Sequence, residues 1–257
     1  MIDSTNVETI VFDLDRTLLH TDKTISSYSI KVLQECKNRG IKIMVATARP
    51  LRTTTQYSEL IDFDAMVVSN GARIIYNNQQ TNDYINFESA KHMLSTFKCY
   101  PHLRITLETG DCAYSNLPIE DYETILCDDL VDVAKREGVL KLLVHLDTED
   151  ALDIVKSTLN DDVYYTVAHG YLLQIMNNTA TKWNGIKTML DICNCSVDKT
   201  IYFGDDQDDI EPLSMCGVGV AVSNGINEAK SVADYITETN DEDGVAKFIK
   251  NMILKEL

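Results

Sequence analysis

Two aspartates separated by one residue, Asp13 and Asp15, follow the apolar and β-branched run Thr9–Phe12. Such a run is typical of a strand that is buried on both faces. Because strand side chains alternate, we expect Asp13 and Asp15 to leave the backbone on the same side and to lie close together. Two close carboxylates repel each other, so the pair predicts a bound cation, a shared proton or both. The alternative is that both aspartates cap the following turn and face water.

Polar residues follow other apolar runs of the chain at the same point. They are Thr47 and Arg49 after residues 41–46, Ser69 and Asn70 after 65–68, Asp205 to Asp209 after 200–203, and Ser223 and Asn224 after 218–222. In a parallel α/β sheet the carboxyl ends of the strands lie on one edge, where ligands bind, so we expect these residues to converge. Clustered carboxylates without matching His or Cys favour Mg²⁺ before Ca²⁺ or Zn²⁺, and such a Mg²⁺ commonly binds a phosphate oxygen. Thr47 would then donate a hydrogen bond to the phosphate, and Lys182 would supply positive charge.

The apolar runs alternate with helical patterns. We predict helices from Ser26 or Ser27 to Gly40, from Pro50 to about Leu60, from Thr181 to Ile192 and up to Cys216, and a closing amphipathic helix that contains Val245, Phe248, Ile249, Met252 and Ile253. Strands that alternate with helices imply a parallel sheet. The sequence therefore predicts an α/β fold with a Rossmann-like parallel-sheet core.

The alternation of buried apolar strands with helices is interrupted between residues 82 and 178. A helix is expected at 87–97, an alternating strand with one exposed face at 103–114, a strand at 139–146, a helix at 149–159, and a hairpin at 163–176 that turns at His169-Gly170. Helices and alternating strands without buried parallel runs are typical of an α+β module. We predict a core of residues 1–81 and 179–257 that carries an inserted α+β domain of residues 82–178.

Composition limits the classes of partner. The chain of 257 residues has a formal net charge of -17, which argues against nucleic acid or an anionic membrane as its main partner. Its first residues, Met1 to Asn6, carry no secretion signal, and no apolar run is long enough to span a bilayer. The seven scattered cysteines are typical of reduced thiols in the cytoplasm, and Cys193 and Cys195 lack the second pair that a zinc site needs. The sequence leaves open whether the chain is a monomer or a homodimer.

The ordered motifs resemble those of the haloacid dehalogenase superfamily, in particular its Cof-type branch with a large α/β cap. The first motif, Asp-x-Asp-x-Thr, is matched by Asp13 to Thr17, the second by Thr47, the motif lysine by Lys182, and the acidic motif by Gly204 to Asp209. The Cof-like segments that begin at Asp234 and Asp243 are also present. The resemblance covers essentially the whole chain.

The resemblance implies a covalent phosphatase mechanism. Asp13 would attack phosphorus to form an aspartyl-phosphate, while Asp15 would first protonate the leaving alcohol and then deprotonate water. Thr47 and Lys182 would hold the oxygens of the transferred phosphoryl group.

The resemblance also implies a metal site and substrate contacts. Mg²⁺ would be held by Asp13, the Asp15 carbonyl and Asp205, with Asp208 and Asp209 in or around its ligand shell. Arg49, Asn70 and Asn224 would contact the substrate; Arg49 has the alternative of a surface charge, and the two asparagines have the alternative of turn residues. Thr17 would either hold the turn by a bond to the backbone or contact the substrate.

Three residues depart from the family pattern. Arg16 stands where Gly is usual, so the backbone there is not expected to adopt a positive φ freely. Asp208 replaces the usual Asn and adds negative charge near the metal, and Ala48 replaces a frequent Gly. None of the three removes a group that the chemistry requires.

We therefore predict a Mg²⁺-dependent phosphomonoester hydrolase that acts on a small phosphorylated metabolite, with sugar phosphates first and nucleotide or cofactor phosphates next. A phosphomutase of the same fold is one alternative, and a non-catalytic phosphate-binding or phospho-accepting regulatory module is another. The inserted domain would select the substrate. Its His145, His169, Tyr114 and Tyr171 are expected to be core or surface residues of strands.

Overall fold

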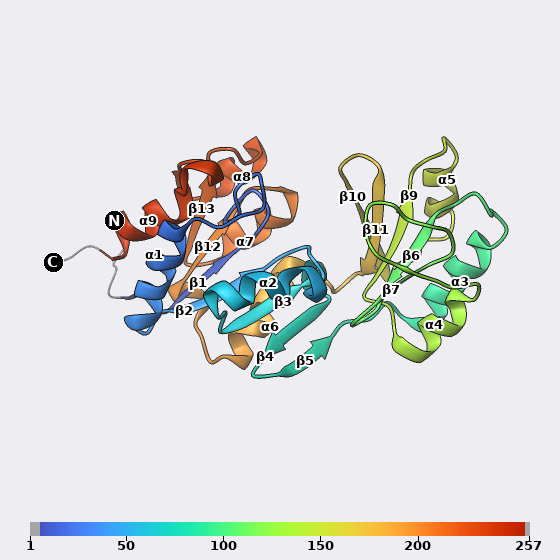
Figure 1. Cartoon of the computed structure of the whole chain (residues 1–257), viewed down its shortest axis with the longest axis horizontal. Helices are drawn as coiled ribbons and strands as arrows, with labels where there is room; N and C mark the ends of the chain where they lie inside the picture. The colour runs from blue at the N-terminus through green and yellow to red at the C-terminus, as the bar shows by residue number, and fades with distance from the viewer. Residues whose placement is uncertain (1–5, 255–257) are drawn as a thin grey trace. The chain divides into compact units, whose positions relative to one another are not determined.

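The computed structural model describes residues 6–254 and forms two compact units. One unit is Asn82–Ala180, and the chain on either side of it forms the other (Figure 1). Residues 1–5, which belong to the N-terminal stretch without an expected secretion signal, lie outside the described residues. Within residues 6–254, no helix combines the length and the apolar composition that a membrane span needs.

The first unit contains a mixed sheet whose central part is parallel. Its strands are β1 (Thr9–Phe12), β2 (Lys42–Ala46), β3 (Ala65–Val68), β4 (Arg73–Tyr76), β5 (Gln79–Asn82), β12 (Thr200–Gly204), β13 (Val218–Val222) and β14 (Tyr235–Thr237), in the spatial order β14-β13-β12-β1-β2-β3-β4-β5. Strands β14 to β3 in this order are parallel, and Val11 of β1 lies opposite Tyr202 of β12 and Met44 of β2. The parallel sheet is confirmed. Strand β4, which pairs antiparallel with β3, and strand β5 were not predicted.

Helices cover both faces of this sheet, so the first unit has three layers. Helices α1 (Ser27–Asn38), α2 (Leu51–Ile61) and α9 (Gly244–Met252) pack on one face, and α6 (Lys182–Ile192), α7 (Ile210–Met215) and α8 (Asn227–Val232) on the other. Each face of the sheet has its own apolar core, and alternate residues of β1 point into the two cores. Phe12 packs with the first group of helices and Val11 with the second. Short 3₁₀ helices η2 (Ser69–Gly71), η3 (Val197–Lys199), η4 (Gln207–Asp209) and η5 (Asn240–Glu242) connect the elements. The central strands β1, β2, β3, β12 and β13 are therefore buried on both faces along most of their length, as apolar runs in parallel sheets usually are.

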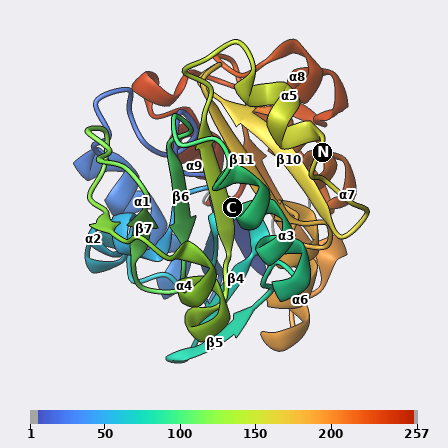
Figure 2. The same cartoon turned by 90° about the vertical axis from the view of Figure 1, so that its right-hand side faces the viewer.

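The second unit is an α+β module. Its sheet has the order β10-β11-β9-β6-β7-β8, from strands β6 (Ile105–Glu108), β7 (Ala113–Ser115), β8 (Ile125–Leu126), β9 (Lys141–His145), β10 (Val163–Ala168) and β11 (Leu172–Asn177). Helices α3 (Phe87–Phe97), α4 (Leu130–Glu137) and α5 (Ala151–Lys156) share one apolar core with one face of the sheet (Figure 2). The hairpin of β10 and β11 turns at His169 and Gly170, as predicted, and both residues have positive φ.

Two expectations for this unit are wrong. Residues 103–114 do not form one strand with an exposed face, because Thr109 and Cys112 close a turn between β6 and β7. Strand β6 is also buried along its whole length, since α3 and α4 cover one face while the Tyr122 hydroxyl donates to Thr106 on the other. Helix α4 was not predicted; it is eight residues long and begins at the N-cap Asp129.

The His and Tyr residues singled out in this unit lie in or beside its strands. His145 is buried, with its ring stacked on Tyr122, and the Tyr114 hydroxyl donates to Glu137. Tyr171 is exposed and stacks on His169. Each has a neighbour within the unit that accounts for its position.

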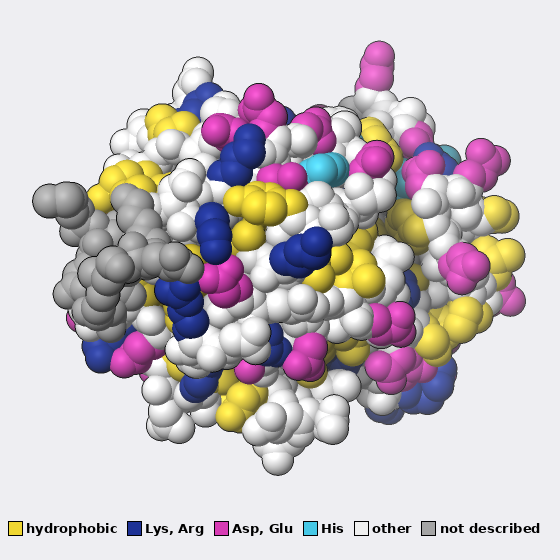
Figure 3. All heavy atoms as spheres, turned by 60° about the vertical axis from the view of Figure 1, so that its left-hand side comes forward, with side chains coloured by type: hydrophobic (Ala, Val, Ile, Leu, Met, Phe, Trp, Pro, Cys, Tyr) yellow, Lys and Arg dark blue, Asp and Glu magenta, His cyan; other side chains and the backbone are white. Residues whose placement is uncertain are grey.

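Figure 3 shows one face of the molecule, on which charged side chains of both signs are mixed. On the face in Figure 3, Lys and Arg side chains stand singly or in small groups between acidic and uncharged ones. A nucleic-acid surface requires a broad basic patch. That face has none, which agrees with the net charge of -17.

Candidate active site

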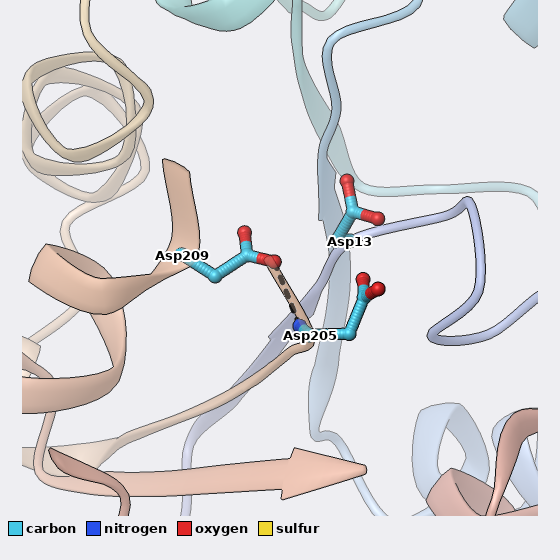
Figure 4. A group of neighbouring side chains, drawn as sticks. All are labelled: Asp13, Asp205 and Asp209. Carbon is cyan, nitrogen blue, oxygen red and sulfur yellow. Dashed lines mark hydrogen bonds between the residues drawn. The ribbon is translucent and has the colours of Figure 1, made fainter. Parts of the chain in front are cut away.

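Three carboxylates from two neighbouring strands meet at one edge of the parallel sheet. Asp13 follows β1, and Asp205 and Asp209 follow β12, which pairs with β1. One oxygen from each lies within 4.8 Å of the others, and the three side chains converge in Figure 4. The residues are only 6%, 3% and 0% exposed. These three carboxylates meet at the edge where the edge rule for parallel sheets expects them, but Asp15, which was expected beside Asp13, is not in the group.

The chain after β12 folds back so that Asp209 supports Asp205. Asp209 Oδ2 accepts hydrogen bonds from the backbone N–H of Asp205 at 2.8 Å and of Asp206 at 3.1 Å. Gly204 makes this approach possible, because a Cβ there would lie 2.5 Å from Asp209 Cβ and 2.6 Å from its carboxyl carbon. Glycine at this point is thus required by the position of the third carboxylate.

Lys182 is the cation of this group. Its Nζ donates to Asp13 Oδ1 at 3.0 Å and to Asp209 Oδ1 at 2.6 Å, and the buried Tyr202 hydroxyl donates to Asp209 Oδ1 at 2.6 Å. Lys182 is the first residue of α6, after the N-cap Thr181. Lys182 therefore lies beside the carboxylates, and its expected contact with phosphoryl oxygens stays a prediction.

Close packing fixes where α6 begins. Gly71, at the end of η2, has a φ of 103°, and a Cβ there would lie 2.1 Å from the Thr181 carbonyl oxygen. Only glycine permits both the positive φ and this approach. The turn after β3 thus sets the distance between Lys182 and the carboxylates.

The group carries more negative than positive charge in a buried place. Burial raises the pKa of Asp13 well above its usual range, and the charges of Asp209 and Asp205 add to this against the attraction of Lys182. Burial and the charge of Asp209 raise the pKa of Asp205 to about 6, although the Thr17 hydroxyl donates to it. Burial acts to lower the pKa of Lys182, but Asp13 and Asp209 outweigh it, so the ammonium stays charged. Such a buried, all-oxygen group with excess negative charge fits a hard divalent cation.

Asp15 lies in a different electrostatic environment. Arg49 donates from Nε to Asp15 Oδ2 at 2.6 Å and from a terminal nitrogen to Oδ1 at 2.7 Å, and Lys23 Nζ donates to Oδ1 at 2.7 Å. Burial acts to raise the pKa of Asp15, but the hydrogen bonds and charges of Arg49 and Lys23 outweigh it and lower the pKa. Strand β1 ends at Phe12, so the alternation of strand side chains does not extend to Asp15, and its carboxylate is not part of the acidic group.

Thr47, Asn70 and Asp208 form a second set of contacts near the ends of β2 and β3. Buried Thr47 accepts from the Arg49 N–H through its hydroxyl at 3.3 Å, and its carbonyl accepts from the Asn70 N–H at 3.1 Å. The Asn70 side-chain amide donates to Asp208, while Asn70 Oδ1 is buried without a hydrogen-bond partner among residues 6–254. Asp208 is outside the group of three carboxylates. Asn70 Oδ1 is therefore a buried hydrogen-bond acceptor at this edge of the sheet that no described residue uses.

The turn after Asp15 departs from expectation at Arg16. Its φ is 61°, so the chain does adopt the left-handed conformation here despite the side chain, and the prediction about its backbone is wrong. Asn224 holds the turn, because its amide donates to the Arg16 carbonyl at 2.8 Å while Arg16 donates to the Asn224 carbonyl at 3.2 Å. Asn224 Oδ1 also accepts from the Asn240 N–H at 2.9 Å, which favours the alternative that Asn224 is a turn residue. The Thr17 hydroxyl donates to the Asp205 carboxylate at 2.8 Å instead of to the backbone of the turn, and its expected contact with the substrate stays a prediction.

The sequence analysis missed Lys23, as it missed Tyr202, whose hydroxyl donates to Asp209. Lys23 lies eight positions after Asp15, in a turn without helical or strand periodicity. Its only signal in the sequence is a positive charge close to an acidic motif, and this is too common to single it out.

Comparisons with known proteins agree on one family. A sequence model of the haloacid dehalogenase-like hydrolases matches residues 10–249. The chain is 27% identical over 260 residues to the 5-amino-6-(5-phospho-D-ribitylamino)uracil phosphatase YitU of Bacillus subtilis, covering 94% of this chain and 96% of that one. It is 23% identical to the phosphatase YcsE of the same organism, which acts on the same compound by its name, with 97% of each chain covered.

Solved structures share the fold. A haloacid dehalogenase-like hydrolase from Bacteroides thetaiotaomicron superposes with a TM-score of 0.87 at 23% identity, covering 96% of this chain and 99% of that one. A sugar phosphatase of subclass IIB superposes with a TM-score of 0.81 at 21% identity, covering 95% and 98%. At these identities the likeness shows the fold.

Proposed function

Since this chain belongs to the haloacid dehalogenase-like hydrolase family and is a phosphatase of that family, we propose that it hydrolyses phosphomonoesters of small metabolites through an aspartyl-phosphate on Asp13. The observation that carries the proposal is the buried Asp13 carboxylate at the end of β1, which Lys182 contacts at 3.0 Å. A nucleophile needs an accessible oxygen and a nearby positive charge for the phosphoryl group. Asp13 Oδ1 accepts from Lys182, which leaves Oδ2 for phosphorus.

Two steps follow from this arrangement. Asp13 attacks phosphorus as the bond from phosphorus to the alcohol oxygen breaks, and Asp15, which takes up a proton once Arg49 turns from it to the substrate, gives that proton to the oxygen. Asp15 then takes a proton from water, whose oxygen attacks phosphorus and releases Asp13 and inorganic phosphate. Thr47 and Lys182 hold the phosphoryl oxygens during both steps.

The donor set fits Mg²⁺. Asp13, Asp205 and the Asp15 carbonyl would hold the ion, and Asp208 and Asp209 would orient the waters around it. When bound, Mg²⁺ supplies positive charge that offsets the repulsion between the carboxylates and a phosphate dianion. The raised pKa values of Asp13 and Asp205 support this proposal, because burial and the neighbouring carboxylates oppose the charged forms that a bound cation would favour.

We propose a small phosphorylated metabolite as the substrate, with sugar phosphates first and nucleotide or cofactor phosphates next. One of the similar structures is a sugar phosphatase, and the relatives YitU and YcsE act on a phosphorylated ribitylamino-uracil, which joins a sugar-alcohol phosphate to a heterocycle. The unit Asn82–Ala180 would select the leaving group, and Arg49 and Asn70 would contact the substrate. Asn70 is supported by its buried and unused Oδ1.

The test is release of inorganic phosphate from a panel of metabolite phosphates and an aryl phosphate, with Mg²⁺ and with chelator. The panel includes hexose and pentose phosphates, nucleotides and 5-amino-6-(5-phospho-D-ribitylamino)uracil. Asp13→Asn and Asp15→Asn keep the size of each side chain and are each expected to lower turnover at least about a thousandfold with the fold intact. Near-normal turnover by either variant would refute the mechanism. Turnover only with a sugar bisphosphate, or a lasting phosphoaspartate without turnover, would favour the phosphomutase or the regulatory module instead.

A further inference from the structure

Two cations, not one, hold the Asp15 carboxylate. Arg49 uses two nitrogens, at 2.6 Å from Oδ2 and 2.7 Å from Oδ1, and Lys23 Nζ shares Oδ1 at 2.7 Å. Both oxygens of Asp15 are thus engaged by charge-assisted hydrogen bonds, which are short and directional. The plane of the carboxylate is fixed from two sides.

Tyr57 of α2 connects the two cations. Its ring is buried and lies 5.4 Å from the Arg49 guanidinium carbon, and its hydroxyl donates to the Lys23 carbonyl at 3.1 Å. One buried side chain therefore supports Arg49 through its ring face and Lys23 through its hydroxyl. This arrangement restricts the motion of both cations relative to Asp15.

The backbone of Lys23 is held in an uncommon conformation. Its φ is 68°, and the turn is closed by hydrogen bonds from the Lys23 N–H to the His20 carbonyl and from the His20 N–H to the Thr24 carbonyl, both at 2.9 Å. A residue other than glycine keeps a positive φ only where its surroundings enforce it. The surroundings of Lys23 are this turn and the Tyr57 hydroxyl, and together they direct its side chain to Asp15.

A phosphate substrate would compete with Asp15 for Arg49 more than for Lys23. The planar guanidinium of Arg49 fits a phosphate as well as a carboxylate, so an anionic substrate competes with Asp15 for it. The ammonium of Lys23 is a point charge on a stem anchored by Tyr57 at the backbone. When Arg49 turns to a substrate, Asp15 Oδ2 loses its partner and can carry a proton, and Lys23 is the contact that remains on Oδ1.

We propose that Lys23, anchored by Tyr57, is a positioning residue that keeps the Asp15 carboxyl aligned with the oxygen of the leaving alcohol. The inference rests on the proposed role of Asp15 as the acid that protonates this oxygen. Alignment matters in proportion to how much the leaving group needs a proton. An alkyl phosphate, whose alkoxide is a poor leaving group, depends on it strongly, whereas 4-nitrophenyl phosphate, whose phenolate leaves readily, depends on it little.

The experiment compares kcat/KM for ribose 5-phosphate and 4-nitrophenyl phosphate, because kcat/KM reports the steps up to departure of the leaving group. The variant is Lys23→Met, which keeps the length of the stem and removes the charge. Lys31→Met, at an exposed position of α1, is the matched control. Tyr57→Phe keeps the ring under Arg49 and removes only the hydroxyl bond to Lys23. Lys23→Arg restores the charge.

We expect Lys23→Met to lower kcat/KM about 10- to 100-fold for ribose 5-phosphate but less than about threefold for 4-nitrophenyl phosphate. Tyr57→Phe is expected to lower the ratio of kcat/KM for ribose 5-phosphate to kcat/KM for 4-nitrophenyl phosphate as well, but by a smaller factor. Lys23→Arg and Lys31→Met are expected to keep this ratio as it is in the unchanged protein. Equal losses on both substrates would overturn the proposal, because a merely structural defect affects both. No loss on either, or a Lys23→Arg variant as selective as Lys23→Met, would overturn it as well.

Failure of this inference is separable from failure of the proposed function. If the unchanged protein releases phosphate with Mg²⁺ and Asp13→Asn and Asp15→Asn do not, the proposed function stands whatever Lys23→Met does. If the unchanged protein releases none, the proposed function itself has failed.

Discussion

Replacing Asp205 with Asn is expected to stabilise the metal-free protein while removing its affinity for Mg²⁺. Burial and the charge of Asp209 raise the pKa of Asp205 from its ordinary value of 3.8 to about 6, against the hydrogen bond from Thr17. The folded protein therefore holds a proton on Asp205 more tightly than the unfolded chain does. It follows that the ionised Asp205 carboxylate lowers the free energy of unfolding at neutral pH.

The size of this effect depends on pH in a defined direction. It is absent below pH 3.8, where the carboxyl is protonated in both states, grows as the pH rises, and is complete above about 6. At about 1.4 kcal/mol per pKa unit, the full cost is about 3 kcal/mol. Asn at position 205 keeps an oxygen that can accept from Thr17, but it loses the ion pair with Arg16 Nε at 3.9 Å. Because the Arg16 side chain is about half-exposed, this ion pair contributes up to about 1 kcal/mol. We expect Asp205→Asn to raise the free energy of unfolding by about 2 kcal/mol at pH 7.5 and by about half as much at pH 5.

Urea unfolding in the presence of EDTA measures this gain. Trp183 is the one tryptophan of the sequence and is buried on α6 next to Lys182, so its fluorescence reports on the unit that contains Asp205. Asp191→Asn makes the same change of charge at an exposed position of α6 and is the control. Mg²⁺ should then stabilise the unchanged protein and leave Asp205→Asn unaffected. A variant less stable than the unchanged protein at pH 7.5 in EDTA, or a gain that is the same at both pH values, would refute the reasoning.

Two further substitutions test the geometry around the carboxylates. Gly204→Ala places a Cβ 2.5 Å from Asp209 Cβ, so we expect it to displace Asp209, to destabilise the protein by about 1–3 kcal/mol in urea unfolding and to weaken Mg²⁺ binding at least about tenfold in calorimetric titration; unchanged Mg²⁺ affinity would contradict the role given to Gly204. Arg16→Gly removes a side chain at a φ of 61° and a charge 3.9 Å from Asp205, so we expect stability within about 1 kcal/mol and Mg²⁺ affinity about two- to fivefold higher; weaker Mg²⁺ binding would show that Arg16 supports the site instead of opposing the ion.

The positions of the catalytic candidates along the fold were predictable because they follow from strand ends. Asp13, Thr47 and Asp205 each come directly after an apolar run, and parallel strands bring their carboxyl ends to one edge. The rule needs only the alternation of strands and helices, which the sequence shows. It places the residues without giving the distances between them.

The partners of the polar side chains were not predictable in the same way. Whether Arg49 contacts a substrate or Asp15 depends on the direction in which its side chain leaves the turn after β2, and periodicity carries no information on that. Lys23 meets Asp15 because the backbone turns through a positive φ, in a segment without a repeating pattern. Strands β4 and β5 were missed for a related reason: their short sequences alternate weakly, and β5 is mostly exposed. Contacts that arise from irregular backbone require the three-dimensional structure.

Asp13 and Asp15 lie in opposite electrostatic environments. Burial and two further carboxylates raise the pKa of Asp13, whereas Arg49 and Lys23 lower that of Asp15. Pairs of acids whose pKa values are driven apart are typical of sites where one acts as nucleophile or base and the other as acid. Here the directions are the reverse of what the proposed roles need, because the nucleophile Asp13 must be ionised and the acid Asp15 must carry a proton; bound metal and substrate therefore have to change both pKa values. The proposed nucleophile thus lies where added positive charge is needed to ionise it. We therefore expect phosphatase activity to disappear with chelator even at a pH where isolated aspartates are fully charged.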